Sequence, residues 1–417
     1  MTDAAVVVVG AGPVGLMAAH VLGRNGVETI ILERRKPRPG QTACAHPASS
    51  GDLRSRAIGI MPPSLELLDG IGLAQEFVAA GVHAATGVVH DEKDELGRLD
   101  FRGVHRHFPF VLAIPQWRTE SMLAAAIAER PKVEICYDVT VDAVVQDTEG
   151  VTLSCRDGSR YRARYAIVCD GARSTLAAAA GLSRGRTTYQ ARFFIADHRD
   201  LTDLADEAHL WFTPSGAVES FPLPGSLRRW IVQLPSGSAL PGADDHIDLE
   251  GIVESRTRYS LDPAGRTWQS AFAPERSELG RFHQGRLLFA GDAAHTMSPI
   301  GGQGMNTGFA DAELAATLVA GRLDGRLTAP DAWGYYQRAR RQAGRSAARR
   351  AWAGMRVGTI TGRAGSWVRG RLVSAALRLA APLLARHFAM MSIPMRHASG
   401  RLPRRLTHHG DSHEASE

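Results

Sequence analysis

The sequence has few cysteines and no long apolar run, and each shortage excludes a class of protein. Its four cysteines form no Cys-x-x-Cys pair and no grouping with histidine at metal-ligand spacing. We therefore expect reduced thiols, no disulfide framework and no metal site. No stretch of roughly 18 uncharged apolar residues occurs, which argues against a membrane-spanning helix. The apolar run after Ala5 is too short for a signal peptide and follows no basic stretch, so we expect a cytoplasmic protein.

Acidic residues are missing from a long C-terminal stretch. The whole chain carries a net charge of +6, but residues 338–405 hold sixteen arginines and no acidic residue, which leaves about −10 for the remainder. Only three lysines occur, Lys36, Lys93 and Lys132, so a coding preference for arginine contributes to the excess. We therefore predict no nucleic-acid partner.

Glycine, in contrast, is abundant and spread along the chain, as in globular proteins with many tight turns. The β-branched residues 6–9 predict a buried strand, residues 10–15 a glycine turn, residues 16–22 a helix and residues 27–32 a second buried strand. This order within about 30 residues is that of a βαβ unit.

The rest of the chain mixes both kinds of element. Helices are predicted over residues 63–73, 122–128 and 307–323 and after Trp333. Strands are predicted over residues 133–145, 151–155, 161–168 and 286–290, with a strand-like pattern through residues 193–234.

The first chemical motif is Gly10-Ala11-Gly12-Pro13-Val14-Gly15. Its glycines permit a tight turn, close approach of a pyrophosphate to the backbone, and close packing of helix on strand. The helix that follows presents free N–H groups and a partial positive charge to the pyrophosphate. Glu33, eighteen residues beyond Gly15, lies where a carboxylate accepts ribose hydroxyls and repels a 2′-phosphate, so FAD or NAD fits this turn and NADP does not.

The second motif is Gly291-Asp292-Ala293-Ala294-His295, followed by Pro299 and Gly301-Gly302-Gln303-Gly304-Met305-Asn306. An aspartate at the carboxyl end of a strand can bind a polyol such as flavin ribitol. The glycine turn lets the backbone lie against a planar ring, and the helix N-terminus stabilises negative charge. A third motif, Cys169-Asp170-Gly171-Ala172-Arg173-Ser174, ends a predicted strand between the other two.

In this order the three motifs resemble the aromatic-hydroxylase family, the class A flavin monooxygenases typified by para-hydroxybenzoate hydroxylase. The resemblance covers roughly residues 6–323. It implies that the glycine turn cradles the FAD pyrophosphate, Glu33 binds ribose, Asp292 binds ribitol and residues 302–306 lie along the isoalloxazine. The implied cofactor-binding residues are Gly10, Gly12, Pro13, Val14, Gly15, Glu33, Arg34, Arg56, Gln116, Val141, Asp170, Asp292, Pro299, Gly302, Gly304, Met305 and Asn306. Pro299, Gly301 and Gly302 are candidates for positions next to the flavin. The family usually carries an arginine after Ser174, and this chain has Thr175 there.

The family's activity implies that NADH or NADPH reduces FAD and that dioxygen forms a flavin C4a-hydroperoxide, which hydroxylates an aromatic or polyketide-like small molecule. The cofactor carries this chemistry, so no metal and no catalytic dyad is needed. Two alternatives stay open: an FAD-dependent reductase, and a flavoprotein with structural FAD that catalyses a redox-neutral step.

Substrate contacts are less clearly marked. Aromatic residues in the strand-rich segment, Phe194, Trp211, Phe212 and Phe221, are candidate pocket walls, although each is equally typical of a sheet core. His46, His105 and His107 are weaker candidates for proton transfer.

We thus predict an α/β protein with a Rossmann-like FAD-binding fold, an inserted mixed β-sheet substrate domain and C-terminal helices. Residues 1–75, 105–185 and 280–332 would form the FAD-binding domain, residues 76–104 and 186–279 the substrate domain, and residues 333–417 an arginine-rich helical region with a flexible tail. Residues 367–391 would pack over the FAD lobe with their arginines outward, or else lie on an anionic membrane surface.

Overall fold

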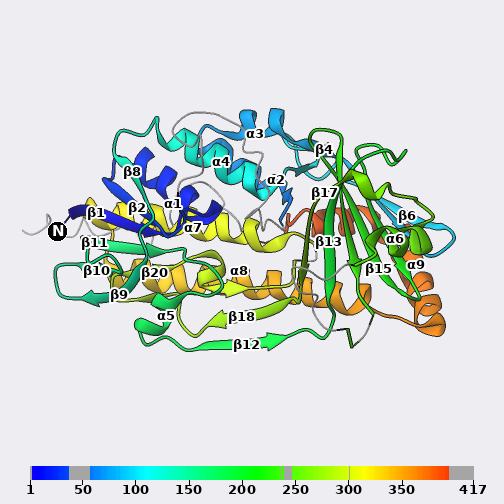
Figure 1. Ribbon diagram of the computed structural model, residues 1–417. Coiled ribbons are helices and arrows are strands. Elements are labelled where there is room, and N and C mark those ends of the chain that lie inside the picture. The colour runs from blue at the N-terminus through cyan, green and yellow to red at the C-terminus, as the bar shows by residue number, and fades with distance from the viewer. Residues whose placement is uncertain (1, 37–56, 236, 239–246, 300, 394–417) are drawn as a thin grey trace, which may run out of the picture.

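The computed structural model describes residues 2–36, 57–235, 237–238, 247–299 and 301–393. Figure 1 shows an elongated molecule with two lobes side by side. The N-terminal strand, α1 and α7 belong to the first lobe, and the upright strands around β13 and β15 form the second. Arg56, His46, Cys44 and the expected C-terminal tail lie outside the described residues.

The first lobe is built on a sheet with five parallel strands in the order β20-β11-β1-β2-β8. These are β1 (Thr2–Val9), β2 (Thr29–Glu33), β8 (Val133–Tyr137), β11 (Arg160–Val168) and β20 (Leu287–Phe289). The β-branched residues 6–8 are fully buried, as a strand covered on both faces requires. Helix α1 (Pro13–Arg24) begins with proline, whose fixed φ suits the first helical turn.

The predicted strand over residues 133–145 was wrong in one respect, because it is two strands. β8 ends at Tyr137, and Asp138 adopts the left-handed φ of 62° that turns the chain. β9 (Val141–Gln146) then pairs antiparallel with β10 (Val151–Cys155), which pairs with β11. The short β19 (His283–Gln284) pairs with β20 at the other edge. Aspartate is among the residues that tolerate this φ, but its sequence neighbours are apolar enough to disguise the turn.

The second lobe is a seven-stranded sheet in the order β17-β13-β16-β15-β14-β5-β6. Its strands are β5 (Thr86–His90), β6 (Glu95–Asp100), β13 (Phe193–Arg199), β14 (Ala208–Thr213), β15 (Gly216–Leu223), β16 (Leu227–Gln233) and β17 (Arg266–Phe272). Only the β14–β5 pair is parallel. Helix α6 (Leu249–Thr257) packs on one face with a cluster around Trp211 and Trp230. The other face is free to line a cavity.

Short elements join the two lobes. β12 (Arg184–Thr188), β18 (Glu275–Leu279) and β21 (His295–Thr296) form one small sheet, and β3 (Gly59–Ile60), β7 (Val111–Ala113) and β4 (Val82–Ala84) form another. The connecting helices are α2 (Pro62–Gly70), α3 (Ala74–Ala80), α4 (Gln116–Ile127) and α5 (Thr175–Ala179), with the 3-10 turns η1 (Pro263–Gly265) and η2 (Gly291–Ala293). The domain boundaries given above stay a prediction.

Three long helices end the described chain. α7 (Gln303–Leu323) packs on α1 in the first lobe, and α8 (Ala329–Gly358) runs along α7 toward the second. α9 (Arg363–Phe388) lies against β6 and β14, with Leu377 and Ala385 buried beside Leu99 and Phe101. The expectation that this last helix covers the FAD lobe was therefore wrong: α9 lies beside β6 at the end of the second lobe (Figure 1), where part of its apolar surface is buried.

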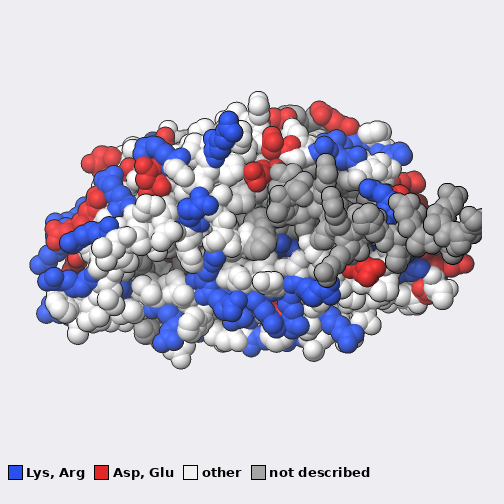
Figure 2. Space-filling view, turned by 180° about the vertical axis from the view of Figure 1, so that it is seen from behind, with Lys and Arg blue, Asp and Glu red and all other residues white. Residues whose placement is uncertain are grey.

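The arginines of these helices do not all point outward as expected. Arg340 on α8 and Arg369 on α9 are buried, and Arg369 donates to the carbonyls of Gly358 and Thr213. Figure 2 shows the molecule from behind, with basic side chains gathered along the lower edge of this face and few acidic ones among them. None of the helices in the described part of the chain is both long and apolar enough to cross a membrane.

Candidate active site

A single large cavity of about 1660 Å³ extends from the first lobe to the second. Its first-lobe wall includes the glycine turn after β1, the end of β2, the start of α7 and the turn η2. Its second-lobe wall is one face of the seven-stranded sheet, and α8 and α9 close the far side. The cavity therefore brings together most of the residues that the sequence motifs selected.

The glycine turn has the geometry that its sequence predicts. Gly10 has a φ of 103°, and a Cβ there would lie 2.5 Å from the Cys169 carbonyl oxygen. A Cβ on Gly15 would lie 1.9 Å from the Gly10 carbonyl oxygen, so Gly15 serves helix packing and does not line the cavity. A Cβ on Gly12 would meet nothing within 4 Å, and Gly12, Pro13 and Val14 line the cavity. The turn thus leaves space against bare backbone.

Glu33, at the end of β2, also lines the cavity. Its carboxylate accepts hydrogen bonds from the Ala11 amide at 2.7 Å and from the Arg35 amide and Nε, both at 2.9 Å. Burial alone would raise the pKa of Glu33, but the hydrogen bond and charge of Arg35 lower it below its usual value. Arg34 lines the cavity as well. The sequence prediction selected Arg34 and missed Arg35. Two adjacent arginines follow the strand, and the sequence does not show which of them turns toward Glu33.

Gln116 and Val141 lie at the same end of the cavity. Gln116, at the start of α4, donates to Glu120 at 2.9 Å, and Glu120 in turn binds Arg35 at 3.0 Å. Val141 begins β9. Gln116, Glu120 and Val141 line the cavity together with Glu33, although β2, α4 and β9 are far apart in sequence.

Asp170 and Asp292 contribute two carboxylates to the wall. One carboxyl oxygen of Asp170 is buried without a hydrogen-bond partner among the described residues, and burial raises the pKa of Asp170. Asp292 is exposed and lines the cavity, and desolvation by the surrounding protein raises the pKa of its carboxyl group too. Arg184, which the sequence did not mark, holds the η2 turn by donating to the carbonyls of Asp292 and Ala293. Both carboxylates have acceptor oxygens available for hydroxyl groups.

The loop before α7 supplies the backbone part of the wall. Gly301 and Gly302 have φ values of 80° and 62°, which favour glycine, and Gly302 is the N-cap of α7. Pro299, Gly301, Gly302, Gly304 and Met305 line the cavity. Asn306 does not: its side chain accepts from the Met61 amide at 2.9 Å and donates to the Gly59 carbonyl at 2.9 Å and the Gly302 carbonyl at 2.7 Å. Asn306 is placed to fix the loop against α2.

Behind this loop lies a buried ion cluster that sequence reasoning missed. Asp311 on α7 accepts from Arg340 Nε at 2.6 Å, from His295 Nε2 at 2.7 Å and from the Gly291 amide at 3.0 Å. Burial opposes ionisation, but His295 and Arg340 lower the pKa of Asp311 to about 2. The cluster ties α7, α8 and the Gly291 turn together. His295 was visible in the second motif, but nothing local pointed to its partner.

Of the four aromatic residues proposed as pocket walls, Phe212 and Phe221 line the cavity. Phe194 and Trp211 do not line it, so the prediction that they are pocket walls was wrong. They pack with Trp230 on the opposite face of the sheet, under α6. Side chains alternate between the faces of a strand, so neighbours Trp211 and Phe212 must point in opposite directions. The cavity face instead carries Phe193 and Ile195.

A family model described as an FAD binding domain matches residues 3–351. The chain belongs to this FAD-binding family. The expected resemblance to the aromatic hydroxylases is confirmed by its relatives, which are monooxygenases, and so is the α/β fold of that family.

Rifampicin monooxygenase from Streptomyces venezuelae is 30% identical over 335 residues, which are 77% of this chain and 64% of that protein. 6-Methylpretetramide 4-monooxygenase from Streptomyces rimosus is 33% identical over 318 residues, 74% of this chain and 54% of that protein. The crystal structure of p-nitrophenol 4-monooxygenase from Pseudomonas putida has a TM-score of 0.79 at 22% identity, covering 95% of this chain and 99% of that chain, a likeness of fold. The chain spans about half to two thirds of the length of the first curated relatives.

The wall residues fit FAD, the cofactor of this family. The open space over Gly12 would take a pyrophosphate, and the unpartnered Asp170 oxygen and the Asp292 carboxylate would take hydroxyl donors. Among the described residues, no three His, Cys, Asp or Glu side chains are grouped to hold a metal ion. Cys136, Cys155 and Cys169 are free thiols.

The histidines proposed for proton transfer lie away from the cavity. His105 Nε2 is 3.0 Å from Glu66, and its Nδ1 accepts from the His107 amide at 3.2 Å. Neither histidine lines the cavity. His46 lies outside the described residues.

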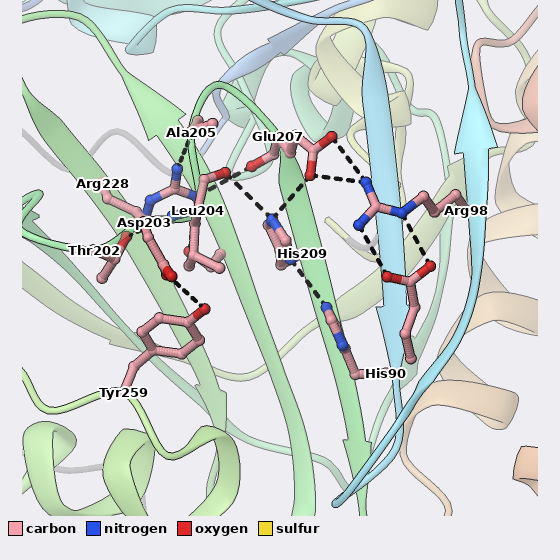
Figure 3. A network of polar contacts seen from close by, with 12 residues as sticks. His90, Arg98, Thr202, Asp203, Leu204, Ala205, Glu207, His209, Arg228 and Tyr259 are labelled. Atoms are coloured by element: carbon pink, nitrogen blue, oxygen red, sulfur yellow. Dashed lines mark hydrogen bonds and ion pairs between the residues drawn. The ribbon is translucent and has the colours of Figure 1, made fainter.

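A different histidine pair, His90 and His209, lies on the second lobe's sheet and does not line the cavity. Figure 3 shows His209 between His90 and the loop that precedes β14. His209 Nδ1 lies 3.0 Å from His90 Nε2, and burial lowers the pKa of His209 to about 4. Arg98 joins Glu95 to Glu207 beside the pair. These polar groups satisfy one another, so the network anchors the loop to the sheet edge.

Proposed function

We propose that this protein is an FAD-dependent monooxygenase that uses NADH or NADPH and dioxygen to hydroxylate an aromatic or polyketide-like small molecule. One observation carries the proposal: a single cavity runs from the glycine turn, where FAD would be held, to an apolar sheet face suited to a ring system. Binding and reaction would then occur in one continuous space.

The cofactor would be held by residues from three motifs. Gly10, Gly12 and Gly15 shape the turn for the pyrophosphate, and Glu33 offers carboxylate oxygens to the ribose. Asp292 offers the same to the ribitol. Bound FAD would supply the reduction of dioxygen by NADH or NADPH, with one oxygen atom entering the substrate and the other leaving as water.

The remaining cofactor-facing residues would support the ring system. Gly301 and Gly302 bring bare backbone to the wall, and the N-terminus of α7 adds a partial positive charge there. Asn306 holds this loop in place through its bonds to Gly59 and Met61. Arg34, Gln116 and Val141 would complete the end of the site near the ribose.

The second lobe would bind the substrate and exclude water from it. Phe212 and Phe221, with the aliphatic residues between them, make the sheet face apolar. Two relatives are named for rifampicin and for 6-methylpretetramide, and both compounds are large ring systems. We propose a substrate of that general kind, bound with its rings against the sheet.

An absorbance spectrum of the purified protein, followed by oxygen and NADPH consumption with a panel of phenolic and polycyclic compounds, tests the proposal. We expect flavin absorbance and substrate-stimulated oxygen uptake. Flavin absorbance with substrate reduction but no oxygen uptake would favour the reductase alternative. Product formation without NADPH oxidation would favour the redox-neutral alternative. A protein that cannot be loaded with FAD would overturn the proposal.

The mouth of the cavity suggests where such a substrate enters. Val368 and Leu372 on α9 line the cavity and are also exposed, and Trp367, Leu379 and Leu383 are exposed on the same helix. No acidic residue lies between residues 338 and 405. We propose a cytoplasmic protein whose α9 touches an anionic membrane surface, from which an apolar substrate could enter.

Co-sedimentation with vesicles at low salt tests whether α9 contacts an anionic membrane surface. We expect binding to vesicles that contain phosphatidylglycerol and none to vesicles of phosphatidylcholine alone. Leu379→Glu should weaken that binding, because it places an acidic group on the most exposed apolar position of α9. Equal recovery in the supernatant with both vesicle types would contradict the membrane contact.

A further inference from the structure

The second-lobe wall of the cavity contains one chemical group that the proposed function does not use. Among the described residues of the seven-stranded sheet that line the cavity, Glu219 is the only ionisable side chain. Its neighbours along β15 on this face are Ala217 and Phe221, and its cross-strand partners are Leu210 on β14 and Ile231 on β16. A carboxyl group therefore stands in the middle of an apolar wall.

Glu219 has no partner among the described residues. It is 8% exposed, and neither a hydrogen bond nor an ion pair joins its carboxyl group to a described side chain or backbone group. Buried carboxylates are normally paired, because leaving one unpaired costs the free energy of its hydration. An unpaired carboxyl group that borders a cavity has room for a partner that is not part of the chain.

No hydrogen bond or ion pair joins Glu219 to the other described charged groups that line the cavity. Arg350 on α8, Arg369 and His387 on α9, and Glu275 on β18 line the cavity from other elements. Arg369 is bound to backbone carbonyls and stacks on Phe212. Burial is the only cause that acts on Glu219, and it raises the pKa of this carboxyl group to about 7. Near neutral pH, both its forms are therefore accessible.

We propose that Glu219 binds a hydroxyl group of the substrate and accepts its proton, which would make the substrate a phenol or an enol. This inference rests on the proposed function for its second half, the proton transfer, but its binding half stands by itself. The carboxylate is an acceptor only, so it selects a hydroxyl hydrogen over an ether oxygen. The apolar wall around it would hold the rest of the ring.

The proton transfer balances without any further reagent. The substrate O–H bond breaks, its proton forms an O–H bond to a Glu219 carboxylate oxygen, and the electron pair stays on the substrate oxygen. The resulting oxyanion makes the ring a better nucleophile toward the oxygen that the monooxygenase delivers. After the transfer, the carboxyl proton returns to solvent or to product. A free phenol has a pKa of about 10, so a base with a pKa nearer neutrality lowers the barrier to ionisation without binding the proton permanently.

Binding of two probes to the FAD-loaded protein tests the first half, by equilibrium dialysis at about pH 9. We expect wild type to bind 1-naphthol about tenfold more tightly than 1-methoxynaphthalene, because only the naphthol donates to the carboxylate. Glu219→Leu should bind both probes about equally. Glu207→Gln, a carboxylate outside the cavity near the same sheet, is the matched control and should behave as wild type. The proposal would be overturned if wild type bound 1-naphthol no more tightly than 1-methoxynaphthalene. It would also be overturned if Glu219→Leu kept the wild-type preference for 1-naphthol.

Glu219→Gln is the second variant, and it tests the base. It retains an acceptor oxygen but cannot take up a proton, so naphthol-stimulated oxygen uptake should fall by about a hundredfold while FAD absorbance stays unchanged. The rise of this rate through about pH 7 in wild type should vanish in the variant, and Glu219→Asp should restore part of it. An unchanged rate and pH profile in Glu219→Gln would overturn the proton transfer. If wild type shows the naphthol preference but no stimulated oxygen uptake, the proposed function fails and the hydroxyl-binding role of Glu219 stands.

Discussion

Asp311 in the first lobe and Glu219 in the second are both buried carboxylates, yet their surroundings differ completely. Asp311 is fully buried and accepts hydrogen bonds from Arg340, His295 and the Gly291 amide. Glu219 is almost as buried and borders a cavity with no partner in the described chain. The pKa of Asp311 falls to about 2, whereas the pKa of Glu219 rises to about 7.

The difference teaches how to tell a structural charge from a functional one. The Asp311 cluster joins three segments of the first lobe, and both carboxylate oxygens of Asp311 accept hydrogen bonds within the protein. Glu219 joins no other described residue, and an unpaired carboxyl group in an apolar wall costs stability that a bound hydroxyl group would offset. The variants below separate these two roles, in order of decreasing effect.

Asp311→Asn should have the largest effect on folding. Neutralising the carboxylate removes the negative charge that pairs with the buried Arg340, and breaking a buried pair in this way costs about 3–5 kcal/mol. Urea unfolding followed by circular dichroism measures the change. Asp324→Asn removes an exposed partner of Arg326 and should cost less than about 1 kcal/mol. Similar losses in the two variants would show that the cluster has no structural role.

Trp211→Ala and Phe221→Ala should separate the two faces of the second lobe's sheet. Trp211 is 4% exposed and packs on Trp230, so its truncation should cost about 3–5 kcal/mol of unfolding free energy. Phe221 faces the cavity, and its truncation should instead weaken 1-naphthol binding with a smaller loss of stability. Urea unfolding and dialysis on both variants make the check. A reversed pattern would mean that the face assignment is wrong.

The pH dependence of stability should distinguish Glu219 from an ordinary carboxyl group. Its folded-state pKa lies above its usual value, so the protonated group favours the folded protein at low pH. This contribution is lost as pH rises through about 7. Relative to Glu219→Gln, wild type should therefore lose about 2–3 kcal/mol between about pH 5 and about pH 9. Unfolding free energies of both proteins at the two pH values give the comparison, and a constant difference would mean that Glu219 is not desolvated.

Gly12→Ala should leave the fold intact and weaken FAD binding. The added methyl group meets no protein atom within 4 Å but would occupy space against which the pyrophosphate lies, and such crowding costs about 1–3 kcal/mol. FAD affinity would then fall about tenfold to hundredfold, as fluorescence titration of the apoprotein can measure. Gly103→Ala also meets nothing within 4 Å, does not line the cavity and should change nothing. Unchanged FAD affinity in Gly12→Ala would place the pyrophosphate elsewhere.

The comparison of lobes also explains how much the sequence could predict. The glycine turn, Glu33 and Asp292 were found because each depends on local spacing after a strand, and the structure brings all three to one cavity. A steric demand such as that of Gly15 is encoded by a single residue type. The cofactor-site residues of the first lobe could therefore be predicted from separate local sequence motifs.

The second lobe could not be read in the same way. Strands buried on both faces carry apolar residues at every position, so the pattern did not show that Phe212 lines the cavity and Trp211 does not. The partners of Asp311 lie on other elements, and only the packing of α8 on α7 brings Arg340 to it. No motif in the sequence marked Glu219, because its burial at the cavity depends on the tertiary fold.

Oxygen uptake by FAD-loaded wild type and Glu219→Gln, measured with NADPH in the presence and absence of 1-naphthol, tests the central claim most directly. The claim is that one cavity joins a flavin to a substrate hydroxyl held by Glu219. We predict that naphthol stimulates uptake by wild type, and that the variant keeps its flavin absorbance but loses the stimulation. Equal stimulation of both proteins, or none in wild type, would contradict it.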